Sequence, residues 1–158
     1  MTAERLRELL NYDPETGLFT WRVDRGGTAR VGAIAGLRDA ADGYIRIKVD
    51  GRRYKAHHLV RLYVRGKWPE AGYMTDHVNG NRADNRLANL RHATFSQNAA
   101  NRKAPTTNTS CFKGVCFHQR IGKWQKRHHL GYFDTAEAAH AAYCAAAQKY
   151  HGRFARAA

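Results

Sequence analysis

Asp76 and His77 are adjacent in a segment rich in amide side chains, residues 75–98. Hydrolysis of a phosphodiester needs an attacking water, a base that titrates near neutral pH and a cation that neutralises charge on the phosphate. Asp76 offers a hard oxygen ligand, His77 has an unperturbed pKa of about 6.5, and the amide oxygen of Asn98 would complete a Mg²⁺ half-site. The segment therefore predicts metal-assisted phosphodiester chemistry. The alternative for an isolated Asp-His pair is a surface carboxylate beside a structural histidine.

The local geometry of this pair limits where it can lie. Neighbouring residues in a regular strand point to opposite faces, so Asp76 and His77 address one phosphate only at a strand end or a bend. Gly80 and the Asn-rich run after it fit such a turn, and residues 86–91 are expected to begin a helix that brings Asn98 back.

The elements before this segment follow from turn signals and periodicity. Thr2 is a candidate N-cap for a short helix with leucines at 6, 9 and 10, and residues 13–17 form a strong turn signal before a strand at 18–21. Residues 44–49 alternate as a half-buried strand, Asp50 and Gly51 favour a two-residue hairpin, and 52–56 return as the paired strand. Residues 57–64 are short and apolar enough for a helix or a strand, and we favour the helix.

The charge of the chain indicates a polyanionic partner. The 158 residues carry 27 Lys+Arg against 13 Asp+Glu, a net charge of +14 and a pI near 10.2. Nucleic acid is the default partner of such a chain, although composition alone also fits a ribosomal-type or merely soluble basic protein. No membrane span or signal region is evident, so we expect a soluble cytoplasmic protein. Three cysteines without a C-x-x-C pair argue against disulfides or a four-cysteine zinc site.

The composition changes along the chain. Residues 1–90 have a net charge of +5 and residues 91–158 of +9. The polar segment 101–110 is predicted to be a linker, which gives domains at 1–100 and 111–158. Short strand-like pieces separated by glycines follow the linker, and residues 134–137 form a capping box before an alanine-rich helix that Gly152 would end. The expected core face of that helix carries Ala139, Tyr143, Ala146 and Tyr150.

Residues 76–98 resemble the core of the HNH endonucleases, the ββα-metal fold, in the subgroup of bacteriophages and intron-encoded homing enzymes. That subgroup has an Asn twelve positions after the His of its Asp-His pair and a metal-ligating Asn nine positions later, and the steps from His77 to Asn89 and from Asn89 to Asn98 match. The resemblance implies that Asp76 and Asn98 bind one Mg²⁺ or Mn²⁺ ion, that His77 is the general base, and that Asn89 holds the loop by hydrogen bonds.

The resemblance extends upstream and covers about residues 10–101. His57 stands at the usual histidine position of the segment before the core, which implies a supporting role in the active site, and His58 stands where Arg is more common. Further matches to phage members are Leu18–Trp21, Gly43–Tyr44 and Trp68–Pro69.

The second segment resembles an AP2-type DNA-binding domain, in which a three-stranded sheet backed by a helix lies in the major groove. The matching residues are 113–115, 122–124, 130–135 and the helix through Tyr143. The DNA-binding candidates that the resemblance implies are Arg120, Lys123, Trp124, Lys126 and Arg127. For Trp124 a place in the core is an equal alternative, and for the basic residues a phosphate contact is favoured over base readout. Part of the second strand and its hairpin is expected to be missing.

The predicted fold is therefore α+β, with an HNH core preceded by a small β-rich segment and followed by a small AP2-like sheet packed on one helix. The leading hypothesis is a phage-encoded, metal-dependent endonuclease, monomeric, that nicks or cleaves double-stranded DNA with one ion per active site and no small-molecule cofactor. The alternatives are a non-enzymatic DNA-binding protein with the nuclease fold and, more distantly, a zinc-binding structural module, for which the His and Cys spacing gives no support.

Overall fold

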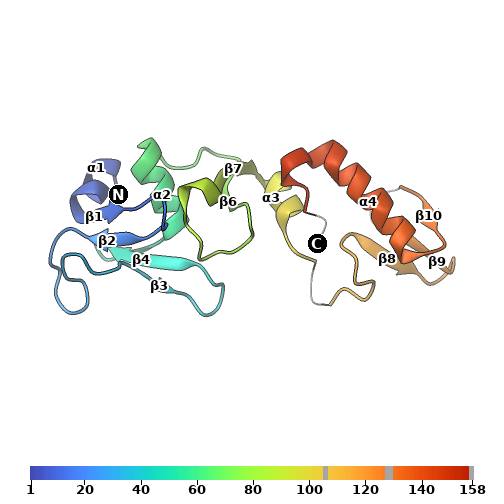
Figure 1. Ribbon diagram of the computed structural model, residues 1–158, viewed down its shortest axis with the longest axis horizontal. Helices are drawn as coiled ribbons and strands as arrows, with labels where there is room; N and C mark the ends of the chain where they lie inside the picture. Colours follow the sequence, from blue (N-terminus) through green and yellow to red (C-terminus); the bar gives the residue numbers. More distant parts are fainter. Residues whose placement is uncertain (105–106, 127–129, 157–158) are drawn as a thin grey trace. The chain divides into compact units, whose positions relative to one another are not determined.

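The computed structural model describes residues 1–104, 107–126 and 130–156. The chain is α+β and divides into two compact units, Met1–Thr94 and Phe95–Ala158 (Figure 1). Each unit has its own small sheets and helices and is described separately below. Within the described residues, no helix is long and apolar enough to cross a membrane.

The first unit opens with a capped helix and a short hairpin. Helix α1 (Ala3–Leu9) begins at Thr2, whose hydroxyl accepts a hydrogen bond from the backbone N–H of Arg5 at 3.2 Å, as predicted. Strand β1 (Leu10–Tyr12) pairs antiparallel with β2 (Phe19–Trp21) across the predicted turn at 13–17. In that turn the N–H of Gly17 donates to the carbonyl of Asp13 at 2.9 Å.

A second sheet and a helix complete the core of the first unit. Strands β3 (Leu37–Arg38), β4 (Ile45–Val49) and β5 (Arg52–Lys55) form an antiparallel sheet in that order. The predicted hairpin is confirmed, because Asp50 and Gly51 have φ of 46° and 80°. The helix favoured at 57–64 is confirmed as α2 (Ala56–Arg65), which ends at Gly66 with φ 73°. The side chains that fill the core come from α1, β1, β2, β4 and α2: Leu6, Leu10, Phe19, Ile47, Val49, Leu59, Val60 and Leu62.

The third sheet of the first unit holds the Asp-His pair. Strand β6 (Tyr73–His77) pairs antiparallel with β7 (Leu90–Thr94), from Tyr73 opposite Thr94 to His77 opposite Leu90. The loop between them ends in a 3₁₀ turn, η1 (Leu87–Asn89). The predicted helix start at 86–91 is therefore wrong. The 3₁₀ turn η1 and the first two residues of strand β7 occupy that range, because the backbone groups of β7 pair along the whole of β6.

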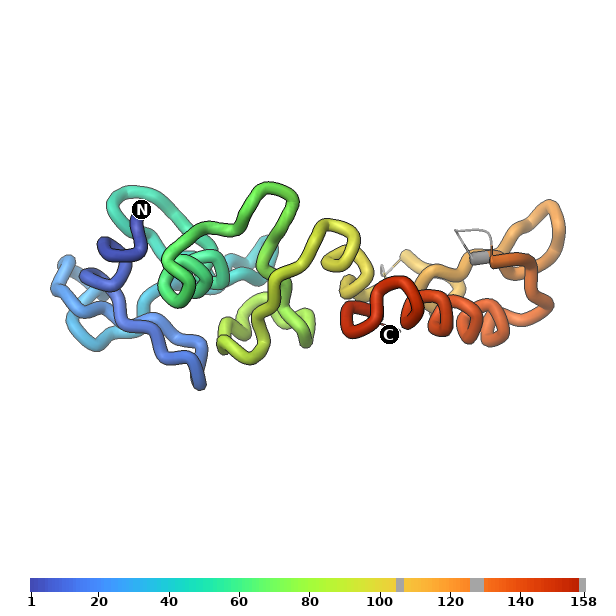
Figure 2. Tube along the Cα trace, turned by 90° about the horizontal axis from the view of Figure 1, so that it is seen from above, coloured from blue at the N-terminus to red at the C-terminus, as the bar shows by residue number. Residues whose placement is uncertain are grey.

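The second unit consists of a small sheet, two helices and a 3₁₀ turn: α3 (Phe95–Asn101), β8 (Val115–His118), β9 (Lys123–Lys126), β10 (Tyr132–Phe133), α4 (Ala136–His151) and η2 (Gly152–Phe154). Strand β9 lies between β8 and β10 and pairs antiparallel with both. Strand β9 is short but pairs on both sides, whereas the hairpin that is expected to be shortened falls at residues 127–129, outside the described residues, so the missing part of the strand and hairpin stays a prediction. Figures 1 and 2 both show α4 running along this sheet.

Helix α4 follows its prediction except at two positions. Its N-cap is Thr135, one residue later than expected for the capping box, and the Thr135 hydroxyl accepts from the N–H of Ala138 at 3.1 Å. It ends at Gly152 as predicted. Ala139 and Ala146 are buried, but Tyr150 is 71% exposed, so its predicted place in the core is wrong. Helix α3 packs on α4 and η2, so the compact second unit begins at Phe95 and includes residues 101–110. The predicted domain bounds, 1–100 and 111–158 with a linker at 101–110, stay a prediction.

Candidate active site

Asp76 and His77 are the last two residues of β6, and both side chains are buried. The expectation that they lie at a strand end is confirmed. Asp76 is paired in register with Arg91 of β7, and Arg91 Nε donates to Asp76 Oδ2 at 2.9 Å. Both side chains of this ion pair are almost inaccessible to solvent, so the carboxylate is held in one orientation.

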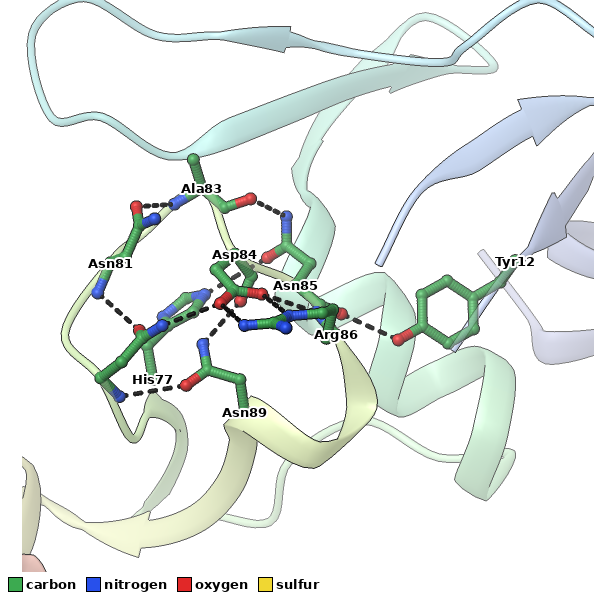
Figure 3. Close-up of polar contacts among 9 residues, drawn as sticks. Tyr12, His77, Asn81, Ala83, Asp84, Asn85, Arg86 and Asn89 are labelled. Atoms are coloured by element: carbon green, nitrogen blue, oxygen red, sulfur yellow. Dashed lines mark hydrogen bonds and ion pairs between the residues drawn. The ribbon is translucent and has the colours of Figure 1, made fainter. Parts of the chain in front are cut away.

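Asn89 closes the loop that follows the Asp-His pair (Figure 3). Its Oδ1 accepts from the N–H of Asn79 at 3.0 Å, and its Nδ2 donates to the carbonyl of Asp84 at 2.8 Å. Its own carbonyl accepts from the N–H of Val78. The amide side chain of Asn89 thus links two parts of the loop backbone by hydrogen bonds. The predicted role of Asn89 in catalysis stays a prediction.

His77 has a polar partner that sequence reasoning missed. His77 Nε2 lies 3.3 Å from Asn85 Oδ1, and both residues are buried (Figure 3). Asn85 Nδ2 donates to the carbonyl of Ala83 at 3.3 Å, which sets the amide with its oxygen toward the imidazole. An amide oxygen only accepts, so Nε2 carries the proton and Nδ1 is the basic nitrogen of the neutral ring. Asn85 is one of many Asn residues in this segment, so composition could not single it out.

Two other ring side chains lie against His77, and a third lies behind one of them. The ring of His57, from α2, lies edge-on at 4.9 Å between centroids, and the ring of Tyr44 lies at 6.0 Å. His58 lies 4.3 Å from His57. Burial lowers the pKa of His77 below its usual range, although the bond to Asn85 and the charge of Asp76 oppose this shift. Burial, helped by His58, lowers the pKa of His57 to about 2. Both rings are therefore neutral at neutral pH.

The loop is also fastened to the N-terminal hairpin. The Tyr12 hydroxyl donates to the carbonyl of Asn85 at 2.8 Å in a buried position, and the N–H of Leu87 donates to the carbonyl of Pro14. A Cβ on Gly17 would lie 2.4 Å from the backbone N of Arg86, so only glycine allows this approach. The turn at 13–17 therefore supports the backbone that carries Asn85.

Asp84, the other carboxylate of the loop, is occupied by structural partners. Arg86 binds it with Nε at 2.8 Å and Nη2 at 2.6 Å, and Asn79 Nδ2 donates to it at 2.8 Å. The Arg86 guanidinium holds the pKa of Asp84 well below its usual range. Asp84 is thus an ionised residue that stabilises the loop through its ion pair and hydrogen bonds, rather than a proton donor.

Asn98, the second predicted metal ligand, is a half-buried residue of α3 and belongs to the second unit. Its partnership with Asp76 stays a prediction. Within the described residues, no cluster of three or more His, Cys, Asp or Glu side chains could hold a metal ion, but that criterion does not cover an Asp with an Asn.

The DNA-binding candidates of the second unit do not share one face of its sheet. Trp124 is opposite Phe117 in the β8–β9 register and contacts it at 5.1 Å, on the face of the buried Val115. Lys123 points to the other face and bonds Asp134 at 3.1 Å. Arg120 lies exposed in the turn before β9, Lys126 is the last residue of β9, and Arg127 lies outside the described residues.

The sequence profile of the HNH endonuclease family matches residues 54–100, which include α2, β6, β7 and all of α3 but its last residue. Protein 3.8 of Escherichia phage T7 is 34% identical over 92 residues, which cover 54% of this chain and 75% of that protein. The chain belongs to the HNH endonuclease family. An uncharacterised HNH endonuclease of Acanthamoeba polyphaga mimivirus is 40% identical over 57 residues, 35% of this chain and 14% of that protein.

Two further similarities accompany the HNH domain. An AP2-like ethylene-responsive transcription factor of Arabidopsis thaliana is 41% identical over 58 residues, 32% of this chain and 12% of the plant protein. A solved structure of DNA binding and cleavage by the HNH homing endonuclease I-HmuI superposes with a TM-score of 0.44 and 26% identity, over 59% of this chain and 51% of that chain. The chain thus spans a small part of the plant and mimivirus relatives and about half of the homing endonuclease.

Proposed function

We propose that this HNH protein hydrolyses phosphodiester bonds of double-stranded DNA, with His77 as the general base and a divalent cation as cofactor. The observation that carries the proposal is the buried His77, whose Nε2 is engaged by Asn85 and whose lowered pKa leaves Nδ1 able to accept a proton at neutral pH. A base in this state can take a proton from a water that attacks phosphorus.

The chemistry of the donor set fits Mg²⁺ or Mn²⁺. The carboxylate of Asp76 is a hard oxygen donor, and the ion pair with Arg91 holds it in place. Asp76 and, on the sequence pattern alone, Asn98 are the proposed ligands of one ion. When bound, such an ion supplies stabilisation of the negative charge that develops on the phosphate.

The remaining residues of the site have positioning roles in this proposal. Neutral His57 fills the space beside the His77 ring without competing for its proton. Asn89 keeps the loop closed, so that Asp76 and His77 stay at the end of the strand. The basic second unit is proposed to add affinity for the DNA duplex through the AP2-like sheet. Of its two faces, the one with Lys123 suits phosphate contacts, because Trp124 shares the other with buried Val115.

The proposal is tested by incubating supercoiled plasmid with the full chain and Mg²⁺ or Mn²⁺, with EDTA as the negative control. Wild type should convert the plasmid to nicked or linear DNA, and His77→Ala should lose at least a hundredfold in rate, in line with general-base effects of about 10²–10⁴. His151→Ala, at the end of α4, is the matched control and should cut like wild type. Equal cutting by His77→Ala and wild type would exclude His77 as the base.

Two further measurements separate the alternatives. Asp76→Asn should weaken Mn²⁺ binding in calorimetry, whereas His77→Ala should retain it; equal binding by Asp76→Asn and wild type would remove Asp76 from the ligand set. A wild-type chain that binds duplex DNA but leaves the plasmid intact with every cation tested would be a DNA-binding protein that only retains the nuclease fold.

A further inference from the structure

The first unit contains a cavity that the proposed chemistry does not use. It has a volume of about 120 Å³ and lies where α2 meets the β6–β7 hairpin. One water needs only about 10–15 Å³ by this measure, so the cavity has room for a larger polar group. Its polar lining comes from Arg61 and Arg65 of α2, Thr75 of β6, and Arg91 and His92 of β7.

Three of these lining residues have a buried polar atom with no partner. Arg61 Nε, Thr75 Oγ1 and His92 Nε2 are inaccessible to solvent and make no hydrogen bond to any described residue. Thr75 and His92 are directly opposite each other in the β6–β7 register, so both point to the same face of the hairpin. Buried polar atoms in native proteins almost always have partners, and these three belong to residues that border one cavity, which makes them candidate donors to a ligand that accepts several hydrogen bonds. A guanidinium, a hydroxyl and an imidazole N–H can each donate.

The charge around the cavity favours an anion. Arg61 and Arg65 of α2 line it, Arg91 borders it from a position whose register partner on the other face of the hairpin is Asp76, and no carboxylate of the described residues lines it. The nearest acids act from outside: Asp76 is bound to Arg91, and Glu70 interacts through space with Arg61 and His92. Arginine forks combined with a hydroxyl are a common arrangement for phosphate, whose oxygens accept hydrogen bonds in several directions.

We propose that this cavity binds a phosphate group. Resting on the proposed nuclease function, we assign that group to the DNA backbone near the bond that is cut, because Arg91 both lines the cavity and holds Asp76. The cavity would then fix the register of the substrate relative to Asp76 and His77. Free inorganic phosphate is the other source of the same chemistry, and the two arms of the test distinguish them.

The first arm measures the binding of inorganic phosphate to the full chain in NMR titrations, in which the chemical shifts of the backbone amides of Thr75 and His92 report binding. Wild type should show a saturable site that Arg61→Gln and Thr75→Val weaken at least fivefold. Arg65→Gln should weaken it as well, and because Arg65 is exposed this change leaves the core intact. Arg30→Gln removes the same charge from an exposed position of the same unit outside the cavity, and should bind phosphate like wild type.

The second arm measures duplex DNA binding in EDTA, where no cutting occurs, as a function of salt. Each phosphate contact contributes about 0.9 to the slope of log affinity against log salt, so Arg61→Gln and Arg65→Gln should each reduce the slope by about that amount. Arg30→Gln should not.

The outcomes separate the proposal from the nuclease function. Lost phosphate binding together with a reduced slope supports a backbone phosphate in the cavity, whether or not the plasmid is cut. Lost phosphate binding with an unchanged slope, or with no DNA binding by wild type, supports a site for free phosphate and overturns its assignment to DNA. Phosphate binding and slopes that are the same in wild type and all cavity variants would overturn the proposal and leave only water in the cavity.

Discussion

The close approach of Gly17 to the loop between β6 and β7 gives a prediction that isolates one steric contact. In Gly17→Ala the new Cβ would lie 2.4 Å from the backbone N of Arg86 and 2.5 Å from the backbone C of Asn85. Backbone atoms cannot rotate away as a flexible side chain can, so the turn or the loop must move. The segment that must yield carries Asn85, the hydrogen-bond partner of His77.

Two contributions make up the expected loss of stability. Gly17 has φ of 75°, a conformation that costs an alanine about 1–2 kcal/mol. The overlap with the loop backbone adds about 1–3 kcal/mol, the range found for overpacked interiors. Gly66→Ala is the matched control, because Gly66 has φ of 73° and nothing within 4 Å of its Cβ position. The stability loss of Gly66→Ala therefore reports the cost of the positive φ alone, without a steric overlap.

The assay combines urea denaturation with plasmid nicking under conditions where each variant is folded. Gly66→Ala should lose about 1–2 kcal/mol and cut like wild type. Gly17→Ala should lose clearly more and cut at least tenfold more slowly, because the Asn85 amide no longer aligns with the His77 ring. Equal losses of stability in the two variants, or full cutting by folded Gly17→Ala, would refute the inference that the turn supports the site.

Three other predictions concern the residues around His77. Tyr12→Phe leaves the buried carbonyl of Asn85 without its donor and should lower the free energy of unfolding by about 1–3 kcal/mol; a loss below about 0.5 kcal/mol in urea denaturation would contradict this. Asn89→Ala removes both side-chain hydrogen bonds that close the loop and should reduce the rate of plasmid nicking. Asn81→Ala, at an exposed position of the same loop, is the control and should reduce that rate far less. Similar nicking rates for the two variants would be evidence that Asn89 does not close the loop. His57 stays neutral in the folded protein down to about pH 2, whereas in the unfolded chain it takes up a proton below about pH 6.5. The unfolded state therefore binds more protons between these values, and the free energy of unfolding falls by up to about 1.4 kcal/mol for each pH unit as the pH is lowered. His57→Phe, which keeps the ring, should flatten that dependence, and an unchanged slope of unfolding free energy against pH would show that His57 is not the group responsible.

Local rules were sufficient for the parts of the fold that local chemistry specifies. The Thr2 cap, the turn at 13–17 and the Asp50-Gly51 hairpin each depend on residues close in sequence, and each was predicted correctly. The place of Asp76 and His77 at a strand end also followed from an alternation rule that needs no tertiary contact. These features could be predicted because their causes lie within a few residues.

The errors have the opposite origin, since they depend on partners distant in sequence. Residues 90–94 have no strong strand pattern of their own and become β7 because β6 offers a full row of backbone partners. Tyr150 stands at helical spacing from Ala146 but lies beyond the sheet that would cover it, and is exposed. Asn85 was missed because one amide among many gains its role only from the ring that it faces.

The contacts of the site also bear on which part of the chain makes up the nuclease. The family profile begins at residue 54, yet Tyr12 and Gly17 contact the loop that carries Asn85, and Tyr44 packs on the rings of His57 and His77. A fragment restricted to residues 54–100 would lose Tyr12, whose hydroxyl donates to the Asn85 carbonyl, and Tyr44, whose ring packs on the rings of His57 and His77. It would also lose most of the hydrophobic core that holds α2, since α1, β1, β2 and β4 supply the residues that pack against it. The N-terminal segment is therefore part of the nuclease domain rather than an appendage to it, because it supports the loop backbone that carries Asn85, whose amide oxygen accepts a hydrogen bond from His77.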